Sequence, residues 1–431
     1  MKTFQLALLV AAASLVACAA PSDDKPAIET VRSSLARDTS PVLSPVEVDS
    51  LSADQAAFAV SLYREVASSP ASAGKNVFLS PHSVSTALAM AYAGARGDTR
   101  AEMKAALHFG LDDARLHAGF DYLDLALSSR GQNAEAKDGR PFRLSIANSL
   151  WSQKGAAFEA PFLDTLAISY GAGVNVVDFS NATEPARLAI NGWVEEKTES
   201  RIKDLIQKDG LSSSTRLVLV NAVYFNAAWS QKFANGETAP APFTKLDGSV
   251  AQVATMHTEL TTRYKQDAAF EAIELPYDGG ETSMLVIAPT KGTFAAFEGS
   301  LTGGKVLDVL AGLEEKPIRL SFPKAKLDGR FDLIQPLRAM GMKAAFDGSA
   351  DFSGISATER LEIGGVIHQT FLDIDEGGTE AAAATAIEFK DTAYHEPPKF
   401  LPMNVDRPYL VAIVDRQTKT LLFMGRIVDP K

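Results

Sequence analysis

A nine-residue run near the middle of this 431-residue chain constrains its fold more than any other segment. Residues 217–225 are all apolar or aromatic except Asn221. A continuous run of this kind predicts a strand buried on both faces, in the middle of a sheet. Asn221 then lies within an apolar layer, where its side chain must be hydrogen-bonded because burying an unpaired amide is costly.

Helical patterns precede this run, and strand patterns dominate after it. Ser52 followed by Gln55 fits a capping box, which predicts a first helix ending near Ser68. Further helices are expected at about 81–93, 162–170, 190–206 and 334–340, and strands at 76–79, 143–151, 174–179, 284–288, 318–322, 409–414 and 420–427. With 46% apolar residues and no internal repeat, residues 51–431 are interpreted as one α+β domain, helices first and sheets later.

The N-terminus has the pattern of an export signal. Residues 1–17 combine Lys2 with an apolar run too short to span a bilayer, which predicts a signal peptide. Residues 15–18, Leu-Val-Ala-Cys, resemble a bacterial lipobox, in which the cysteine is lipidated and becomes the mature N-terminus. Cys18 is the only cysteine, so acyl chains are expected to hold the protein at a membrane.

Residues 18–50 are rich in Pro, Ser, Asp and Thr, and are expected to form a flexible linker between the lipid and the domain. The protein is therefore expected to be exported and either lipid-anchored to the cell envelope or extracellular. Ala19 after the lipidated cysteine favours the outer membrane, by resemblance to known sorting patterns.

Charge and motifs exclude several classes of function. The formal net charge of −11 disfavours nucleic acid as a partner. The chain has no Gly-x-Ser-x-Gly elbow, no phosphate-binding Gly-x-x-x-x-Gly-Lys, and no His-Glu-x-x-His pair among its six histidines. We therefore expect no metal, no cofactor and no enzymatic activity.

The stretch from Asp375 to Ala386 is unusual for a loop because small residues follow an acidic pair and two glycines. If it were extended, alternate residues would share one face and present nothing bulky to neighbouring strands. These residues are Thr379, Ala381, Ala383 and Thr385. An alanine-rich helix is the alternative, and local composition does not choose between the two.

Several segments together resemble the serpin family. Residues 76–84 (NVFLSPHSV), 219–225 (LVNAVYF), 351–354 (DFSG) and 423–430 (FMGRIVDP) are similar to serpin signatures and occur in the family's order. The resemblance implies a serpin fold with eight to nine helices, three β-sheets, an exposed reactive-centre loop and a metastable native state. It also implies a monomer that inhibits serine endopeptidases as a suicide substrate: the cleaved loop inserts into the central sheet and traps the acyl-enzyme.

The resemblance carries over three groups of residues. Trp229 falls in the breach, where the central sheet first opens. The shutter, a polar cluster beneath the strands that must part, comprises Ser80, Ser83, Asn221 and His368. The hinge of the loop comprises Glu376, Gly377, Gly378, Thr379, Ala381, Ala383 and Thr385.

Family spacing from Glu376 places the scissile bond between Thr392 and Ala393. A threonine there suits the small specificity pocket of an elastase-like or subtilisin-like protease. The chain has extra residues beyond this point, with Pro397, Pro398 and Pro402 among them, so the bond could be shifted. The alternatives are Phe389 or Tyr394, which suit a chymotrypsin-like enzyme, and Lys390, which suits a trypsin-like one.

A non-inhibitory serpin, acting as a binding or chaperone-like envelope protein, is the competing interpretation. It is disfavoured because the hinge has no charged residue and no proline at an inward-facing position.

Overall fold

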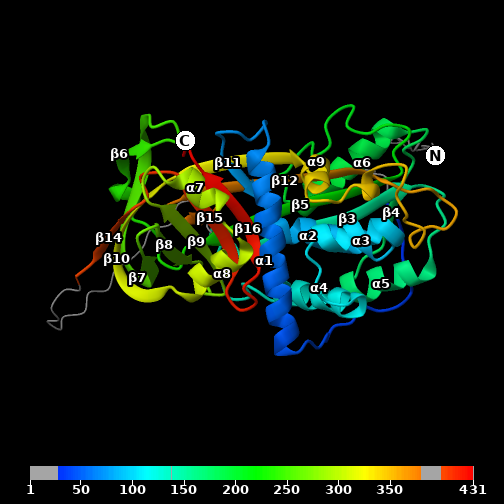
Figure 1. Cartoon of the computed structure of the whole chain (residues 1–431), viewed down its shortest axis with the longest axis horizontal. Helices are drawn as coiled ribbons and strands as arrows, with labels where there is room; N and C mark the ends of the chain where they lie inside the picture. Colours follow the sequence, from blue (N-terminus) through cyan, green and yellow to red (C-terminus); the bar gives the residue numbers. More distant parts are fainter. Residues whose placement is uncertain (1–27, 137, 380–398, 431) are drawn as a thin grey trace, which may run out of the picture.

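The computed structural model describes residues 28–136, 138–379 and 399–430. It contains two β-sheets, and helices cover both faces of the first of them (Figure 1). The α-helices of the described part are α1 (Pro45–Ser68), α2 (Pro81–Tyr92), α3 (Gly97–Ala106), α4 (Asp113–Ser128), α5 (Ala160–Tyr170), α6 (Thr183–Lys197), α7 (Phe294–Gly299), α8 (Gly303–Ala311) and α9 (Ile334–Ala339), with 3-10 turns at Asn235–Glu237 and Ala344–Phe346. None of these helices is long and apolar enough to cross a membrane.

The first sheet has seven strands and contains the predicted buried run. Its spatial order is β1 (Glu29–Val31), β4 (Val174–Val177), β3 (Arg143–Gln153), β5 (Leu217–Ala228), β13 (Gly378–Thr379), β12 (Ile363–Asp375) and β11 (Ala325–Asp332). All twelve residues of β5 are buried, which confirms the strand predicted at 217–225. Strand β5 is covered on both faces because apolar clusters pack against each.

The second sheet has nine strands. They follow the order β14 (Leu401–Asn404), β10 (Glu314–Pro323), β7 (Val250–Gln266), β8 (Phe270–Pro276), β9 (Thr282–Pro289), β15 (Tyr409–Asp415), β16 (Leu421–Ile427) and β2 (Val77–Leu79), with β6 (Ala239–Thr244) on β7. Three sheets were expected, but the described strands form two. The long β7 joins what would be separate sheets, because its first part pairs with β6 and β10 and its last residues pair with β8.

Helix α2 lies at the centre of the molecule, and all twelve of its residues are buried. It contacts β3 and β5 of the first sheet and β16 of the second. Pro81 at its first turn suits a helix start, because that position needs no backbone N–H donor. Because α2 packs against β5, polar residues near its N-terminus, such as Ser83, lie directly beneath that strand.

The N-terminal strap, which we define as residues 28–44, corrects the expected flexible linker. Strand β1 adds to the edge of the first sheet by pairing antiparallel with β4. Beyond it, Ser33 Oγ donates to Asp164 (2.5 Å), and the Asp38 N–H donates to the Ile168 carbonyl (3.0 Å). The composition predicted a flexible linker, but the Ser33 side chain and the Asp38 backbone both find partners on α5. Residues 28–44 thus belong to the folded body, which was expected to begin only at Leu51.

Helix α1 also begins earlier than predicted, at Pro45 instead of near Ser52. Ser44 and Glu47 form the capping box, with the Ser44 N–H donating to Glu47 Oε2 (2.8 Å). Pro45 occupies the first helical position, where proline is favourable because no backbone N–H donor is needed. Ser52 and Gln55, the predicted cap, are buried inside the helix.

We predict that Arg37→Ala destabilises the docked strap. Arg37 Nε donates to Asp121 Oδ1 (2.7 Å) and Nη2 donates to Asp124 Oδ2 (2.6 Å), and the Asp121 side chain is only 1% exposed. Removing the guanidinium leaves a buried carboxylate without its cation, so we expect a loss of about 2–3 kcal/mol of unfolding free energy. Urea unfolding measures it. Arg32→Ala, at an exposed residue of the same strap, is the control, and equal unfolding of both variants would contradict the prediction.

Candidate functional site

The two middle strands of the first sheet are separated at one end. Strand β13 lies between β5 and β12: Thr379 pairs with Ala227 on one side and Ile374 on the other. Further along, β5 and β12 pair directly with each other, from Leu217 to Val223 on β5. Gly378 and Thr379, the fourth and fifth residues of the stretch from Asp375 to Ala386, are therefore already part of the sheet.

The side chain of Thr379 is fully buried. Its Oγ1 lies 2.7 Å from the hydroxyl of Tyr277, so the two hydroxyls are hydrogen-bonded. The preceding residue, Gly378, has φ of 150°, and a Cβ there would meet the Ala227 carbonyl oxygen at 2.2 Å. Glycine is required here because the backbone passes too close to β5 for any side chain.

Glu376 holds the start of this segment in place. Its carboxylate accepts from Lys324 Nζ (2.7 Å) and from Thr238 Oγ1 (2.6 Å), while its carbonyl accepts from the Phe233 N–H (2.9 Å). Partial burial raises the pKa of Glu376, but these hydrogen bonds outweigh it and lower the pKa below its ordinary value. Glu376 is therefore ionised at neutral pH and forms an ion pair with Lys324, which directly precedes β11.

Trp229 lies where the strands separate. Its ring stacks on Tyr277, with centroids 4.7 Å apart and planes 7° from parallel. Its Nε1 donates to the Asp375 carbonyl (2.9 Å), and its backbone N–H donates to the Gly377 carbonyl (3.0 Å). Trp229 thus connects the end of β5 to the residues that enter the sheet, at the position expected for the breach.

The structure brings the four predicted shutter residues together. The Ser80 N–H donates to His368 Nε2 (2.8 Å), and His368 Nδ1 is hydrogen-bonded to Asn221 Oδ1. Asn221 Nδ2 in turn donates to Ser83 Oγ and to Asn148 Oδ1, the latter at 2.6 Å. The hydrogen-bonded pair His368–Asn221 thus bridges β12 and β5 directly beneath their ladder.

The hydrogen bonds fix the tautomer of His368. Because Nε2 accepts a backbone N–H, the single ring proton lies on Nδ1 and is donated to Asn221. Burial lowers the pKa of His368 to about 3. The ring is therefore neutral at physiological pH.

Sequence reasoning missed four contacts of the site: Asn148, Thr238, Tyr277 and Lys324. Asn148 could have been suspected, because it is an amide inside a strand pattern, as Asn221 is. The other three had no local signal, because only the fold places them beside residues 375–379. Nine of the predicted site residues lie outside the described part. They are the five candidates for the scissile bond, three hinge residues and the lipidation site: Phe389, Lys390, Thr392, Ala393, Tyr394, Ala381, Ala383, Thr385 and Cys18.

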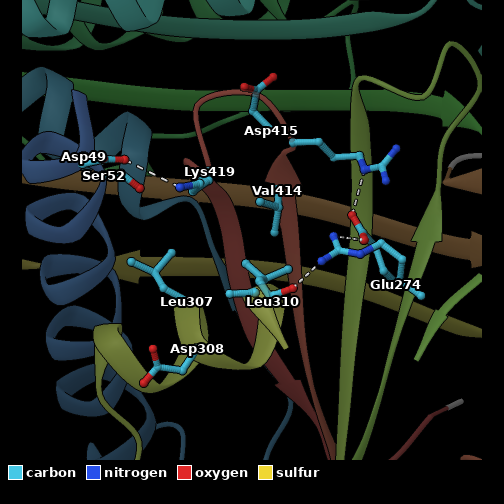
Figure 2. Close-up of a pocket in the computed structure, with 12 residues that line it drawn as sticks. Asp49, Ser52, Glu274, Leu307, Asp308, Leu310, Val414, Asp415 and Lys419 are labelled. Carbon is cyan, nitrogen blue, oxygen red and sulfur yellow. Dashed lines mark hydrogen bonds and ion pairs between the residues drawn. The ribbon is translucent and has the colours of Figure 1, made fainter. Parts of the chain in front are cut away.

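A separate cavity of about 400 Å³ lies between α1, α8 and the β15–β16 hairpin (Figure 2). Glu274 inside it accepts from Arg263 Nη1 (2.7 Å) and Arg416 Nε (2.9 Å), and Lys419 pairs with Asp49 (3.6 Å) at its rim. Its charged groups mostly neutralise one another. Across the described residues, no group of three or more side chains is arranged to hold a metal ion.

Comparison with known proteins identifies the family. A family model described as "Serpin (serine protease inhibitor)" matches residues 53–430. The chain is a serpin. An uncharacterised serpin-like protein of Thermococcus kodakarensis is 41% identical over 374 residues, covering 87% of this chain and 84% of that one. The leukocyte elastase inhibitor of Bos taurus is 34% identical over 398 residues, covering 89% and 100%.

Solved structures agree with the fold of this serpin. The native thermophilic serpin tengpin superimposes with a TM-score of 0.80 at 26% identity, covering 93% of this chain and 99% of that one. Thyroxine-binding globulin, solved with thyroxine, gives a TM-score of 0.76 at 29% identity, covering 88% and 99%. The family therefore includes proteins named for protease inhibition and one named for binding a small molecule.

We predict that His368 makes this serpin less stable in acid. The unfolded chain takes up a proton at His368 near pH 6.5, whereas the folded chain takes it up only near pH 3. Stability contributed by the neutral ring is therefore complete above about pH 6.5 and is lost as pH falls toward 3, by about 1.4 kcal/mol per pH unit. Urea unfolding of the wild type and His368→Gln across this range measures the difference in slope. Parallel curves for the two proteins would contradict the assignment, since His82 and His117, whose pKa values burial also lowers, titrate in both.

Proposed function

We propose that this serpin inhibits serine endopeptidases as a suicide substrate. The observation that carries the proposal is the position of β13, which already separates β5 from β12 at one end. A strand that enters a sheet between two others can continue by the same pairing, provided the ladder beyond it opens. Protease cleavage of the loop would release the chain needed for that.

The observed register specifies what continued insertion would do. Gly378 and Thr379 pair with Ala228 and Ala227, so each later residue would pair one position earlier on β5. Continued in step, Thr385 would stand between Asn221 and His368, which now pair with each other. It would also face the same side of the sheet as Thr379, because the two are six residues apart. The threonine hydroxyl would then lie where the His368–Asn221 bond must break.

The energies favour insertion once the loop is free. Each new backbone hydrogen bond is worth about 1 kcal/mol net, so about a dozen inserted residues give on the order of 10 kcal/mol. The gain holds only if the inward side chains fit, since a misfit costs about 1–3 kcal/mol. The inward positions are small: Thr379, Ala381, Ala383 and Thr385.

Trapping then depends on two competing rates, those of loop insertion and of hydrolysis of the acyl-enzyme. The protease's serine Oγ attacks the carbonyl carbon of Thr392, the peptide C–N bond breaks, and the amine of Ala393 leaves with a proton. The acyl ester that remains joins the protease to residue 392. If insertion carries the protease away before water hydrolyses this ester, the complex is permanent. If it does not, the serpin is only a substrate.

The target class rests on the residue at the bond. Thr392 favours an elastase-like or subtilisin-like enzyme, and similarity to a leukocyte elastase inhibitor agrees with that choice. Because thyroxine-binding globulin, which is 29% identical, shares the same fold, family membership alone does not establish inhibition. The small inward hinge residues favour an inhibitor over a non-inhibitory binding protein.

We also propose that residues 1–17 are removed on export and that Cys18 carries the lipid anchor, in the outer membrane. The support is the Leu-Val-Ala-Cys sequence after a short apolar run.

Mixing the purified serpin with pancreatic elastase, subtilisin, trypsin and chymotrypsin tests the inhibitor proposal. We expect a complex that survives denaturing electrophoresis with elastase or subtilisin, and mass spectrometry should place the cleavage after Thr392. Cleavage by every enzyme with no trapped complex would exclude suicide inhibition.

Thr379→Arg tests the insertion step. The arginine cannot fit the buried site beside Tyr277, so loop cleavage should continue while the yield of trapped complex falls about tenfold or more. Leu401→Arg is the matched control, because it places the same side chain at a residue that is 40% exposed just beyond the loop. Equal complex yields from both variants would argue against insertion.

Cys18→Ser tests the anchor. We expect the wild type to sediment with membranes and the variant to be released, and mass spectrometry of the wild-type N-terminus should show acyl chains on Cys18. Membrane association of the variant would show that the anchor lies elsewhere.

A further inference from the structure

The N-terminal strap lies at the end of the first sheet opposite the hinge. The pairing registers define a row across the sheet through Glu29, Val176, Ser152, Leu217 and Ile363. The hinge enters at Ala228, the other end of β5. Eleven steps along β5 separate the two rows, which is about 36 Å at the usual strand rise.

The hinge and the strap also lie toward opposite ends of the whole molecule. Strand β14, which follows the reactive-centre loop, lies at one end of the longest axis, and β4, which holds the strap, lies toward the other (Figure 1). Phe400, just before β14, lines the same surface hollow as Ala228 and Trp229. Both ends of the loop therefore meet the body far from the strap.

Docking of the strap shortens the tether to the proposed anchor. Ten steps separate Cys18 from Ile28, so the chain between them reaches at most about 35 Å. If the strap were free, the tether would extend to Pro45, a reach of about 95 Å. The docked strap therefore confines its own end of the molecule to the neighbourhood of the anchor.

Specific contacts make this attachment firm. Besides the β1–β4 ladder, Thr30 Oγ1 donates to Asn175 Oδ1 (2.8 Å), and Arg37 bonds both Asp121 and Asp124. Gly173 leaves room for the strap, because a Cβ there would lie 2.6 Å from the Val31 carbonyl oxygen.

We propose that the strap fixes the orientation of this serpin on a lipid surface. The end of the first sheet at Glu29 and Leu217 faces the lipid, and the bait loop faces away from it, toward passing proteases. The inference rests on the proposed lipidation of Cys18 and the proposed loop insertion. It adds that insertion, which runs along β5 from Ala228 toward Leu217, carries the captured protease toward the membrane.

The physical reason for such a device is steric. A loop held within about 35 Å of a bilayer would leave little room for a protease to approach. An anchor alone does not prevent this, because a 95 Å tether lets the body turn either end to the lipid. The strap removes that freedom without needing direct contact between the body and the lipid.

Energy transfer from single labels to labelled lipid headgroups tests the orientation. The full-length lipidated protein is reconstituted in phospholipid vesicles, with a donor dye on Leu401→Cys at the loop end or on Ser213→Cys at the far end of β5. Each introduced thiol is the only one free, because Cys18 is the only native cysteine and is acylated. We expect strong transfer from position 213 and several-fold weaker transfer from position 401.

Releasing the strap should abolish the difference in energy transfer between the two labels. The double variant Gly173→Val/Arg37→Glu places a side chain where the Val31 carbonyl lies and a carboxylate against Asp121 and Asp124. Both β1 and the rest of the strap should then be released, and both labels should give similar transfer. Arg32→Glu makes the same charge change at an exposed strap residue and should keep the wild-type difference. Equal transfer from the two labels in the wild type, or an undiminished difference in the double variant, would overturn the inference.

A labelled protease tests whether insertion carries the captured enzyme toward the membrane. Transfer from donor-labelled subtilisin to the lipid should rise several-fold as the trapped complex forms, and should stay low for subtilisin whose catalytic serine is replaced by alanine. A trapped complex without this rise would overturn the inference while leaving inhibition intact. Vesicle flotation and the mass of Cys18 are measured on the same samples, so failure of the anchor is recognised separately.

Discussion

From Leu217 to Val223, β5 pairs directly with β12, while at Ala227 and Ala228 the two strands are separated by β13. The rest of the site depends on this arrangement, in which β5 and β12 pair directly over only part of their length. Glu376, Trp229 and Tyr277 hold the entering strand at the open end, and His368 with Asn221 holds the strands together farther along. One sheet thus contains both a strand that has begun to enter and the polar contact that stops it.

The polar contact that holds β5 and β12 together can be broken without separating charges. The His368–Asn221 pair is buried and neutral, so opening it exposes no buried charge. Thr385 would arrive in register between these two residues and could hydrogen-bond to either. The barrier is therefore local and polar, whereas the gain from a complete new strand is distributed over its length. In the proposed mechanism, such a difference would let a metastable sheet persist until cleavage frees the loop.

The strap gives the molecule a second organising feature, because it ties the N-terminal segment to the end of the first sheet opposite β13. Contacts on α4, α5 and β4 hold it, and none of them lies near the loop. Under the proposed function and anchor, presentation of the bait and attachment of the chain would thereby lie at opposite ends. The two functions can then operate without steric conflict.

The sequence by itself determined the buried strand at 217–225, most helix and strand positions, and the family, because apolar periodicity and ordered signatures are local patterns. It also indicated the small residues of the hinge and the polar residues Ser80, Ser83 and His368. It did not reveal the strap, because Pro-rich and Ser-rich composition describes a chain without partners, and its partners Asp121, Asp164 and Asn175 are far away in sequence. Only the tertiary structure decided that β13 already lies between β5 and β12, and that Lys324, Tyr277 and Asn148 join the site. Those contacts depend on strand register across the sheet, which no single segment encodes.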